Sequence, residues 1–264
     1  MAREEIVIST DSGKTAQQPA IAAVNLVKQY HDDQQPALDA VTLTIAQGDF
    51  FGLLGPNGAG KTTAFSFLSG LRMPDSGSVR VCGLEFRTHR RALHRIIGIV
   101  PQEIALYERM TARENLLFFG RLLGLRRERL KDRVEDCLEI ARLAQRAEQP
   151  VASYSGGMKR RLNLVIALLN EPHILFLDEP TVGIDTQSRH LIHQQLHLLH
   201  QQGTTILYTT HYMEEAQQLC SRIAILDQGR ILQEGAPDDL LQATNHPHLE
   251  ALFLDLTGKQ LRDT

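Results

Sequence analysis

A glycine-rich loop restricts the folds open to this chain more than any other stretch. The loop reads GPNGAGKTT at residues 55–63; the apolar run DFFGLLG leads into it, and a helical pattern follows at 64–71. Glycines leave backbone N–H groups free to surround phosphates, Lys61 can reach the β- and γ-phosphates, and the Thr62 hydroxyl can bind Mg²⁺. The residues expected to contact a nucleotide here are Gly55, Pro56, Asn57, Gly58, Ala59, Gly60, Lys61, Thr62 and Thr63. We therefore predict an α/β fold with a P-loop nucleoside triphosphatase core.

Two adjacent carboxylates close a second apolar run. The run is ILFLDEP, and it places Asp178 and Glu179 at the end of a strand. Carboxylates at such a position are costly unless a cation or a proton transfer uses them. Asp178 is expected to hold Mg²⁺, either directly or through a bound water molecule. Glu179 is expected to orient or deprotonate the water that attacks the phosphate. The pair could instead cap the next helix, but the phosphate loop favours the catalytic interpretation.

Polar residues also follow two other strand-like runs. Gln102 follows IIGIVP, and His211 follows TTILYTT. The carboxyl ends of parallel strands face the ligand crevice of an α/β sheet, so each residue could serve the site or be an ordinary strand-end residue. Tyr30, at the end of AAVNLVKQY, could stack on an adenine or be an edge-strand aromatic.

The remaining sequence alternates between strand-like and helical segments. The strand-like runs are AAVNLVKQY, ALDAVTLTI, SVRVCG, IIGIV, ILFLD and TTILYTT, and RIAILDQGRILQEG reads as a hairpin. Such alternation around buried strands predicts a mainly parallel sheet. From Thr111 to about Gln149 the pattern is helical throughout and begins with a capping box of Thr111 and Glu114. This stretch has the character of an inserted helical subdomain.

Composition argues against several classes of protein. The net charge of −3 gives no polybasic signal for nucleic acid or anionic lipid. A membrane helix needs about 20 apolar residues, whereas the longest near-apolar run, residues 162–169, is interrupted by Asn163. The N-terminus lacks the apolar core of a signal peptide. If the protein works at a membrane, we expect it to dock on another chain.

Cysteines and histidines show no metal-type spacing. The cysteines Cys82, Cys137 and Cys220 are scattered, which indicates reduced thiols in a cytosol. The histidine-rich run at residues 190–200 lacks the flanking carboxylates and ligand spacing of known metal sites. A solvated helix face is the favoured interpretation of that run.

A second candidate phosphate contact lies in SYSGGMKRR, at residues 153–161. The stretch reads as the start of a helix, in which Ser155 and the two glycines after it can present backbone N–H groups. The three cations at residues 159–161 oppose the helix dipole, and a nearby anion would ease that conflict. For each cation singly, snorkelling or pairing with a local acid is the favoured role.

The ordered set of motifs resembles the nucleotide-binding subunits of ABC transporters over about residues 21–264. The set comprises Tyr30, GPNGAGKTT, Gln102, YSGGM, ILFLDEP, VGID and His211. YSGGM resembles the signature motif of that family, with Tyr154 where Leu is usual and Met158 where Gln is usual. The Met form, EPTVGIDTQSR, YTTHYMEEAQQLC and the tail LEALFLDLTGKQLRD are similar to the branch that exports drugs, polysaccharides or lipids, including its antibiotic-resistance members.

The resemblance implies a domain organisation. Residues 1–20 would be a flexible extension, and residues 21–264 a single ABC ATPase domain. An antiparallel β subdomain would lie at the N-terminal side, and a helical subdomain would occupy about residues 104–160. A C-terminal hairpin and tail would fill about residues 222–264.

The resemblance also implies cofactors and residue roles. ATP and Mg²⁺ would be bound, with Thr62, Gln102 and Asp178 at the metal. Glu179, His211 and Gln102 would serve catalysis, with His211 holding the γ-phosphate and water and Gln102 reporting the nucleotide state to a membrane partner.

In the family, two subunits share each nucleotide. The signature helix of one subunit caps the γ-phosphate bound to the phosphate loop of the other, which would explain two phosphate contacts in one chain. Asp185 would link the two sites across the interface. The nucleotide contacts outside the phosphate loop would be Tyr30, Ser155, Gly156, Gly157 and Asp185.

The implied function is ATP hydrolysis that drives export through a separate integral membrane permease. The chain would lie at the cytoplasmic face of the cell membrane, and the permease would meet a groove near Leu106–Gly120. A homodimer is expected, although the sequence leaves a heterodimer open, and no nucleic acid partner is expected. The alternative is a soluble ABC ATPase acting on nucleic acid or ribosomes, but such chains carry two cassettes or a long coiled coil. A non-catalytic nucleotide-binding regulator is disfavoured by the intact Lys61, Asp178, Glu179 and His211.

Overall fold

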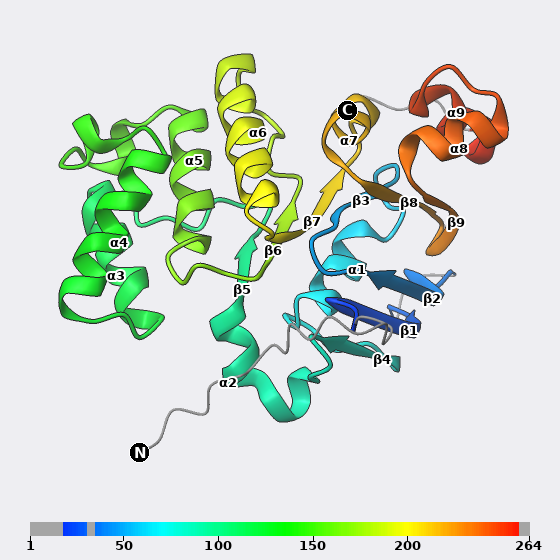
Figure 1. The fold of residues 1–264 in the computed structure, drawn as a ribbon, viewed down its shortest axis with the longest axis horizontal. Helices are drawn as coiled ribbons and strands as arrows, with labels where there is room; N and C mark the ends of the chain where they lie inside the picture. The colour runs from blue at the N-terminus through cyan, green and yellow to red at the C-terminus, as the bar shows by residue number, and fades with distance from the viewer. Residues whose placement is uncertain (1–17, 31–34, 259–264) are drawn as a thin grey trace.

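Two sheets and a lobe of helices make up the described part of the chain (Figure 1). The structure, a computed structural model, describes residues 18–30 and 35–258. The expected extension at residues 1–20 lies almost wholly outside these ranges. The strands are β1 (Ile21–Lys28), β2 (Leu38–Ile45), β3 (Phe50–Leu54), β4 (Ser76–Val81), β5 (Ile97–Val100), β6 (Ile174–Asp178), β7 (Thr205–Thr210), β8 (Arg222–Asp227) and β9 (Arg230–Gly235). The α-helices are α1 (Lys61–Leu68), α2 (Phe86–Ile96), α3 (Ala112–Leu122), α4 (Arg127–Ile140), α5 (Gly156–Ala167), α6 (Thr186–Gln201), α7 (Met213–Leu219), α8 (Pro237–Thr244) and α9 (Leu249–Thr257).

A six-stranded sheet in the order β5-β6-β7-β3-β8-β9 forms the core. Its strands pair in parallel except for β8 and β9, which form the antiparallel hairpin predicted from the sequence. Phe50 and Leu54 of β3 join one buried cluster, whereas Phe51 and Leu53 join another. The sheet is therefore covered on both faces, which explains why its central strands are continuous apolar runs. The predicted mainly parallel α/β sheet is confirmed.

The carboxyl ends of three neighbouring strands meet at one edge of this sheet. In the parallel register Asp178 of β6 lies beside Thr209 of β7, and Leu54 of β3 lies beside Thr210 of β7. The segments that follow these strands carry the phosphate loop, Glu179 and His211. The topology thus brings three segments that are far apart in sequence to one crevice.

A three-stranded antiparallel sheet in the order β2-β1-β4 forms the N-terminal side. In β2, Val41, Leu43 and Ile45 are buried and the intervening Thr42 and Thr44 are exposed. This alternation is typical of a sheet with one face on the core. The buried face shares a hydrophobic cluster with α1, and the expected antiparallel β subdomain is confirmed.

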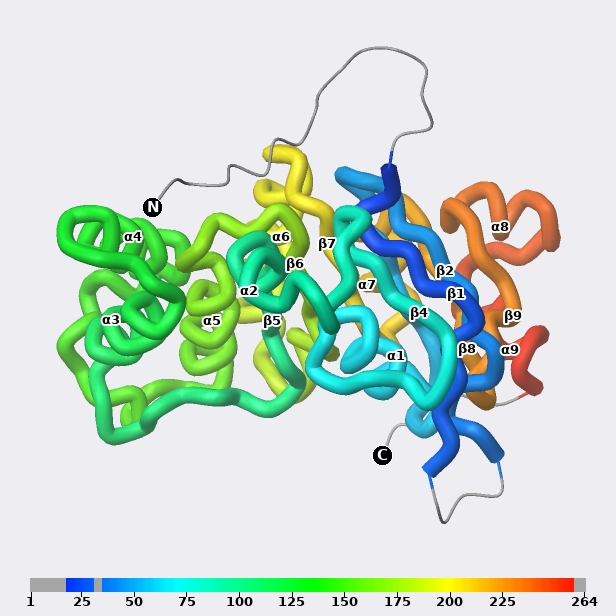
Figure 2. Tube along the Cα trace, turned by 90° about the horizontal axis from the view of Figure 1, so that it is seen from below, coloured from blue at the N-terminus to red at the C-terminus, as the bar shows by residue number. Residues whose placement is uncertain are grey.

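The helices α3, α4 and α5 lie beside one another at the opposite end of the molecule from β1, β2 and β4 (Figure 2). The capping box that starts α3 is present, because Thr111 accepts from the Glu114 N–H and Glu114 accepts from the Thr111 N–H. α5 spans the expected boundary at residue 160. The sequence did not predict α2, in which Phe86, Leu93 and Ile96 are buried and most other residues are polar. No helix in the described ranges combines the length and the apolar character needed to cross a bilayer.

Candidate functional site

The phosphate loop joins the end of β3 to the start of α1. The N-cap of α1 is Gly60, whose φ of 104° is a left-handed conformation that favours glycine. A Cβ on Gly60 would also lie 2.3 Å from the carbonyl oxygen of Ala37. No side-chain hydrogen bond caps α1, so N–H groups of its first turn can bind an anion. The predicted order of strand, loop and helix is confirmed, and contacts of individual loop residues with a nucleotide stay predictions.

Lys61 is the first residue of α1, directly after this loop, and is only 5% exposed. Its ammonium donates to the carbonyl oxygens of Gly55 and Pro56 at 2.9 and 3.2 Å. The Lys61 Nζ also lies 3.2 Å from the Glu179 Oε1. The structure therefore joins the phosphate loop and the end of β6 through a buried ion pair.

Asp178 ends β6 as a buried carboxylate. Its Oδ1 accepts a hydrogen bond from the Thr209 hydroxyl at 2.5 Å. Burial raises the pKa of Asp178 above its usual value, whereas hydrogen bonds from Thr209 and Thr62 oppose that shift. Asp178 and Thr62, two of the expected metal ligands, are thus neighbours, and a cation beside them would stabilise the charged carboxylate.

Glu179 follows Asp178 with an unusual backbone. Its φ is 45°, a left-handed conformation that is uncommon for a non-glycine residue. The Glu179 N–H donates to the Thr209 Oγ1 at 3.0 Å and to the Thr209 carbonyl at 3.1 Å. The Oε2 of the carboxylate lies 3.3 Å from the Nδ1 of His211. Burial alone would raise the pKa of Glu179, but His211 and Lys61 hold it below its usual value, so the carboxylate is charged at neutral pH.

Gln102 and Tyr30 are less closely tied to this cluster. Gln102 is exposed just beyond β5, and its backbone carbonyl accepts a hydrogen bond at 2.7 Å from Arg160 of α5. Tyr30 is half-buried beyond β1, with the Lys28 ammonium 5.2 Å from its ring centroid. Neither contact tests the expected role of the side chain, so metal binding by Gln102 and adenine stacking by Tyr30 stay predictions.

The loop of residues 155–157 starts α5 and lies against the start of α6. Ser155 is the N-cap of α5, and its hydroxyl accepts from the Met158 N–H at 3.2 Å. Asp185 is the N-cap of α6 and accepts from the Ser188 N–H at 2.9 Å. A Cβ on Gly157 would lie 1.9 Å from the Ser188 Oγ, whereas a Cβ on Gly156 would meet no atom within 4 Å. Gly157 is therefore needed for helix packing, while Gly156 faces open space.

The three cations at residues 159–161 already have protein partners. Lys159 forms an ion pair with Glu108, as expected for a cation near a local acid. Arg160 is 3% exposed and donates to backbone carbonyls of Pro101, Gln102 and Glu179. The expectation that it would snorkel or pair with an acid is therefore wrong. The reason is that the Arg160 side chain extends from α5 to the ends of β5 and β6, where its hydrogen-bond acceptors are backbone carbonyl oxygens.

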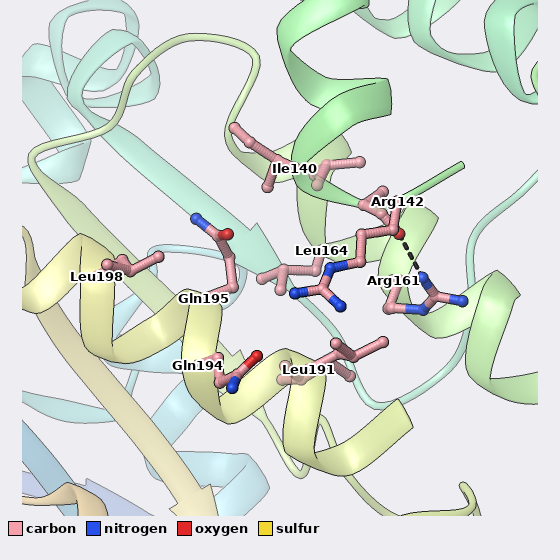
Figure 3. Close-up of a pocket in the computed structure, with 11 residues that line it drawn as sticks. Ile140, Arg142, Arg161, Leu164, Leu191, Gln194, Gln195 and Leu198 are labelled. Carbon is pink, nitrogen blue, oxygen red and sulfur yellow. Dashed lines mark hydrogen bonds between the residues drawn. The ribbon is translucent and has the colours of Figure 1, made fainter. Parts of the chain in front are cut away.

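Arg161 is turned toward the helical lobe instead. Its guanidinium donates to the carbonyl oxygen of Ala141, beyond the end of α4 (Figure 3). Arg161 and Arg142 line a small cavity between α4, α5 and α6, together with Leu164, Leu191 and Leu198. Arg161 thus contributes to the packing of the lobe.

A buried carboxylate that sequence reasoning missed lies behind His211. Glu215 of α7 is 4% exposed, and its Oε2 accepts from the Thr181 hydroxyl at 2.9 Å and the Tyr208 hydroxyl at 2.6 Å. Its Oε1 lies 3.5 Å from the Arg189 Nε and 3.6 Å from the His193 Nε2. Glu215 therefore ties β7 and α7, which flank His211, to α6, whose N-cap is Asp185. The only sequence signal was a glutamate four residues after His211.

The histidine-rich run on α6 is not simply a solvated face. His193 is half-buried toward Glu215, and the His200 Nε2 lies 2.8 Å from the carbonyl oxygen of Gly48. His190 and His197 are exposed as expected. The difference arises because residues 193 and 200 are two turns apart on the side of α6 that meets the core.

The two candidate phosphate contacts of the chain lie in different parts of it. Both views place α5, with residues 155–157 at its start, in the helical lobe and α1 beneath the core sheet (Figures 1 and 2). Lys61, Asp178, Glu179 and His211 gather at the α1 side, as the distances above show. Asp185 lies instead beside residues 155–157, since a Cβ on Gly157 would approach its Oδ2 to 2.8 Å.

Comparisons with known proteins show which sequences this chain resembles. Residues 38–182 match the sequence model of a family described as ABC transporter. The chain is similar to the Nod factor export ATP-binding protein I of Sinorhizobium fredii, with 46% identity over 84% of this chain and 64% of that protein. It is also similar to the linearmycin resistance ATP-binding protein LnrL of Bacillus subtilis, with 44% identity over 83% of this chain and 70% of that protein.

A solved structure shares the fold. It is the dimeric, post-hydrolysis state of the ATP-binding cassette MJ0796 bound to ADP and Pi, which superposes with a TM-score of 0.75 and 28% identity. The match covers 82% of this chain and 98% of that one. The expected α/β core with an antiparallel sheet and a helical insert is the fold of both.

Proposed function

The chain belongs to the ABC transporter family, and we propose that it binds and hydrolyses ATP to drive export through a separate membrane permease. One observation supports the proposal: Lys61, Asp178, Glu179 and His211 lie together at the phosphate loop, while the second glycine loop, residues 155–157, lies apart from them in the helical lobe (Figures 1 and 2). In a dimer, each chain would thus supply the phosphate loop of one nucleotide site and the glycine loop of the other. We call these two shared sites the composite sites.

The residues at the phosphate loop fit ATP and Mg²⁺. The Lys61 ammonium would bind β- and γ-phosphate oxygens in addition to its present carbonyl partners. The Thr62 hydroxyl and the Asp178 carboxylate are hard oxygen ligands of the kind Mg²⁺ prefers. Burial disfavours the charged form of Asp178 and raises its pKa, and a cation beside the carboxylate would offset that cost. When bound, Mg²⁺ offsets negative charge on the phosphates. The Gln102 side chain is a further candidate ligand, because it follows the neighbouring strand β5.

Glu179 is the candidate general base. Its depressed pKa keeps the carboxylate charged, so its oxygens can accept a proton from, or orient, an attacking water. His211, whose Nδ1 is 3.3 Å from that carboxylate, would hold the water and the γ-phosphate on the other side. Tyr30 would stack on the adenine.

Two chains would close around two ATP molecules. Ser155, Gly156 and Gly157 would present backbone N–H groups to the γ-phosphate bound by the partner chain, as an isologous two-fold interface requires. Asp185, which lies beside Gly157, would link the two sites. Loss of the γ-phosphate on hydrolysis would favour the open state, because a ligand drives motion only through its different affinities for two states. The dimeric state of the MJ0796 cassette supports this reading.

The permease partner is supported by family membership and by an aromatic cluster near α3. Tyr107 is 49% exposed, and its ring centroid lies 4.9 Å from that of Phe118 and 5.9 Å from that of Phe119. Residues 106–120 would receive a cytoplasmic helix of the permease and hold the chain at the cytoplasmic face of the membrane. The names of the two relatives favour export of a drug, lipid or polysaccharide, and a homodimer is the simplest assembly.

Changing Glu179 tests whether the phosphate loop is a hydrolytic site. Glu179→Gln should nearly abolish ATP hydrolysis and leave ATP binding intact, because the amide keeps the size of the side chain and cannot accept the proton. Lys61→Ala should instead weaken binding itself. Turnover and nucleotide affinity are measured separately for each variant, and wild-type turnover in Glu179→Gln would contradict the assignment of the base.

A further inference from the structure

Arg160 is a buried cation whose partners are backbone carbonyls. Its Nη1 donates to the carbonyl oxygens of Gln102 at 2.7 Å and Pro101 at 3.2 Å, and its Nη2 donates to that of Glu179 at 3.1 Å. Within residues 18–30 and 35–258, no carboxylate oxygen lies within 4.0 Å of its guanidinium nitrogens. The negative charges of Asp178 and Glu179 act on the guanidinium only from a distance. Burying an arginine with no directly paired acid is costly, so this side chain needs an explanation beyond the packing of α5.

The three carbonyls belong to the segments that carry the candidate catalytic groups. Gln102 follows β5, Glu179 follows β6, and Arg160 itself stands one turn into α5, whose start is the glycine loop of residues 155–157. These segments are up to 78 positions apart in sequence, so only the fold brings them together.

The contact with Glu179 falls on a strained residue. A left-handed backbone at a non-glycine residue is strained and persists only where the surroundings fix it. Thr209 holds the Glu179 N–H from β7, and Arg160 holds the Glu179 carbonyl from α5. With both ends of the residue held, the carboxylate is aimed between Lys61 and His211.

We propose that Arg160 is a positioning residue that couples the glycine loop of its own chain to Glu179 and Gln102 of the same chain. The inference rests on the proposed function, in which that glycine loop meets the nucleotide of the partner chain. A shift of α5 on binding the partner's nucleotide moves the guanidinium, and with it the carbonyl that fixes Glu179. Nucleotide at one composite site thereby sets the geometry of the catalytic carboxylate at the other, a coupling through one rigid contact chain.

Arg161 provides a matched control. It is the next residue on α5, and its guanidinium also donates to a backbone carbonyl, that of Ala141 in the helical lobe. Removing Arg161 therefore costs packing without touching Glu179 or Gln102. Lysine at position 160 keeps the charge, but a single ammonium cannot reproduce the planar fork that spans the carbonyls.

The first experiment compares Arg160→Met, Arg160→Lys and Arg161→Met in the full chain. Thermal unfolding, ATP affinity and steady-state hydrolysis are measured for each. Misplacing a catalytic group by about 1 Å can cost about 100-fold, so Arg160→Met should lower kcat by roughly 10- to 100-fold with ATP affinity unchanged. The kcat of Arg160→Lys should lie between those of wild type and Arg160→Met. Arg161→Met should keep the wild-type kcat even if it unfolds at a lower temperature.

A mixed dimer with two affinity tags tests on which chain Arg160 acts. In the first dimer, one chain carries Arg160→Met and keeps Glu179, and its partner carries Glu179→Gln. In the second dimer, one chain carries both changes and its partner is wild type. Coupling within a chain predicts lost turnover in the first dimer and retained turnover in the second. The reverse result would mean that Arg160 acts on the nucleotide held by the partner, and the proposal would be wrong.

Two further outcomes overturn the proposal without touching the proposed function. Wild-type kcat in folded Arg160→Met, or an equal loss in Arg161→Met, would reduce Arg160 to a packing residue. If Arg160→Met does not fold, the same criteria apply to Arg160→Lys. ATP-dependent dimerisation of Glu179→Gln should survive the addition of Arg160→Met, whereas failure of Glu179→Gln alone to dimerise would count against the proposed function instead.

Discussion

Replacing Gly157 with alanine should destabilise the fold, whereas the same change at Gly156 should not. An ideal Cβ on Gly157 would lie 1.9 Å from the Oγ and 2.5 Å from the Cβ of Ser188. The hydroxyl can rotate away, but the Ser188 Cβ moves only with the backbone of α6. Overpacking of this kind costs about 1–3 kcal/mol. A Cβ on Gly156 meets no atom within 4 Å, and alanine is favoured over glycine in helices by up to about 1 kcal/mol.

Thermal unfolding of the two variants measures this difference. A loss of 1 kcal/mol lowers the Tm of a chain of this size by about 2–4 °C, so Gly157→Ala should unfold about 2–12 °C below wild type. Gly156→Ala should match or exceed wild type. Adding Ser188→Ala to Gly157→Ala removes the Oγ but not the Cβ, and should restore only part of the loss. Equal Tm values for the two single variants would refute the close packing of α5 on α6.

Two other buried polar groups yield predictions. Thr209→Val should lower kcat for ATP hydrolysis, because it removes the hydroxyl that donates to Asp178 and accepts from the Glu179 N–H; Thr209→Ser should keep most activity, and equal losses in both would contradict the role of the hydroxyl. Burial would raise the pKa of Glu215, but hydrogen bonds from His193, Tyr208 and Thr181 hold it below its usual value. The charge of Glu215 therefore adds stability that is present above the unfolded pKa of a glutamate, about 4.3, and is lost as the pH falls through the lower folded pKa. Urea unfolding of Glu215→Gln should therefore depend less on pH between 7 and 4 than that of wild type, and an unchanged dependence would be the contrary result.

The sequence was sufficient for the parts of the site that lie in contiguous motifs. The phosphate loop and the Asp178–Glu179 pair were readable because each sits directly after an apolar strand. Parallel strands then place those ends together by geometry alone. The two faces of the core sheet follow from continuous apolar runs, and the exposed threonines of β2 follow from alternation.

Groups that act through distant partners could not be read in this way. Arg160 contacts carbonyls 58 and 59 positions before it and 19 positions after it, and backbone carbonyls carry no sequence signature. Glu215 likewise depends on Thr181, 34 positions away. α2 was missed because most of its residues are polar and only three are buried, so its apolar face is narrow although it follows the helical period.

The most direct test of the account is the ATP-dependent mass of Glu179→Gln, with and without Gly156→Asp. Light scattering with saturating ATP, in parallel runs without and with Mg²⁺, should find a dimer of Glu179→Gln, because trapped ATP keeps the two chains closed. Gly156→Asp should return that variant to a monomer, since its carboxylate would stand where the partner's γ-phosphate must come and like charges repel strongly when desolvated. The open space around Gly156 leaves room for the new side chain within the folded chain. A Glu179→Gln chain that stays monomeric in both runs, or a double variant that still dimerises, would contradict the claim that residues 155–157 complete the nucleotide site of a second chain.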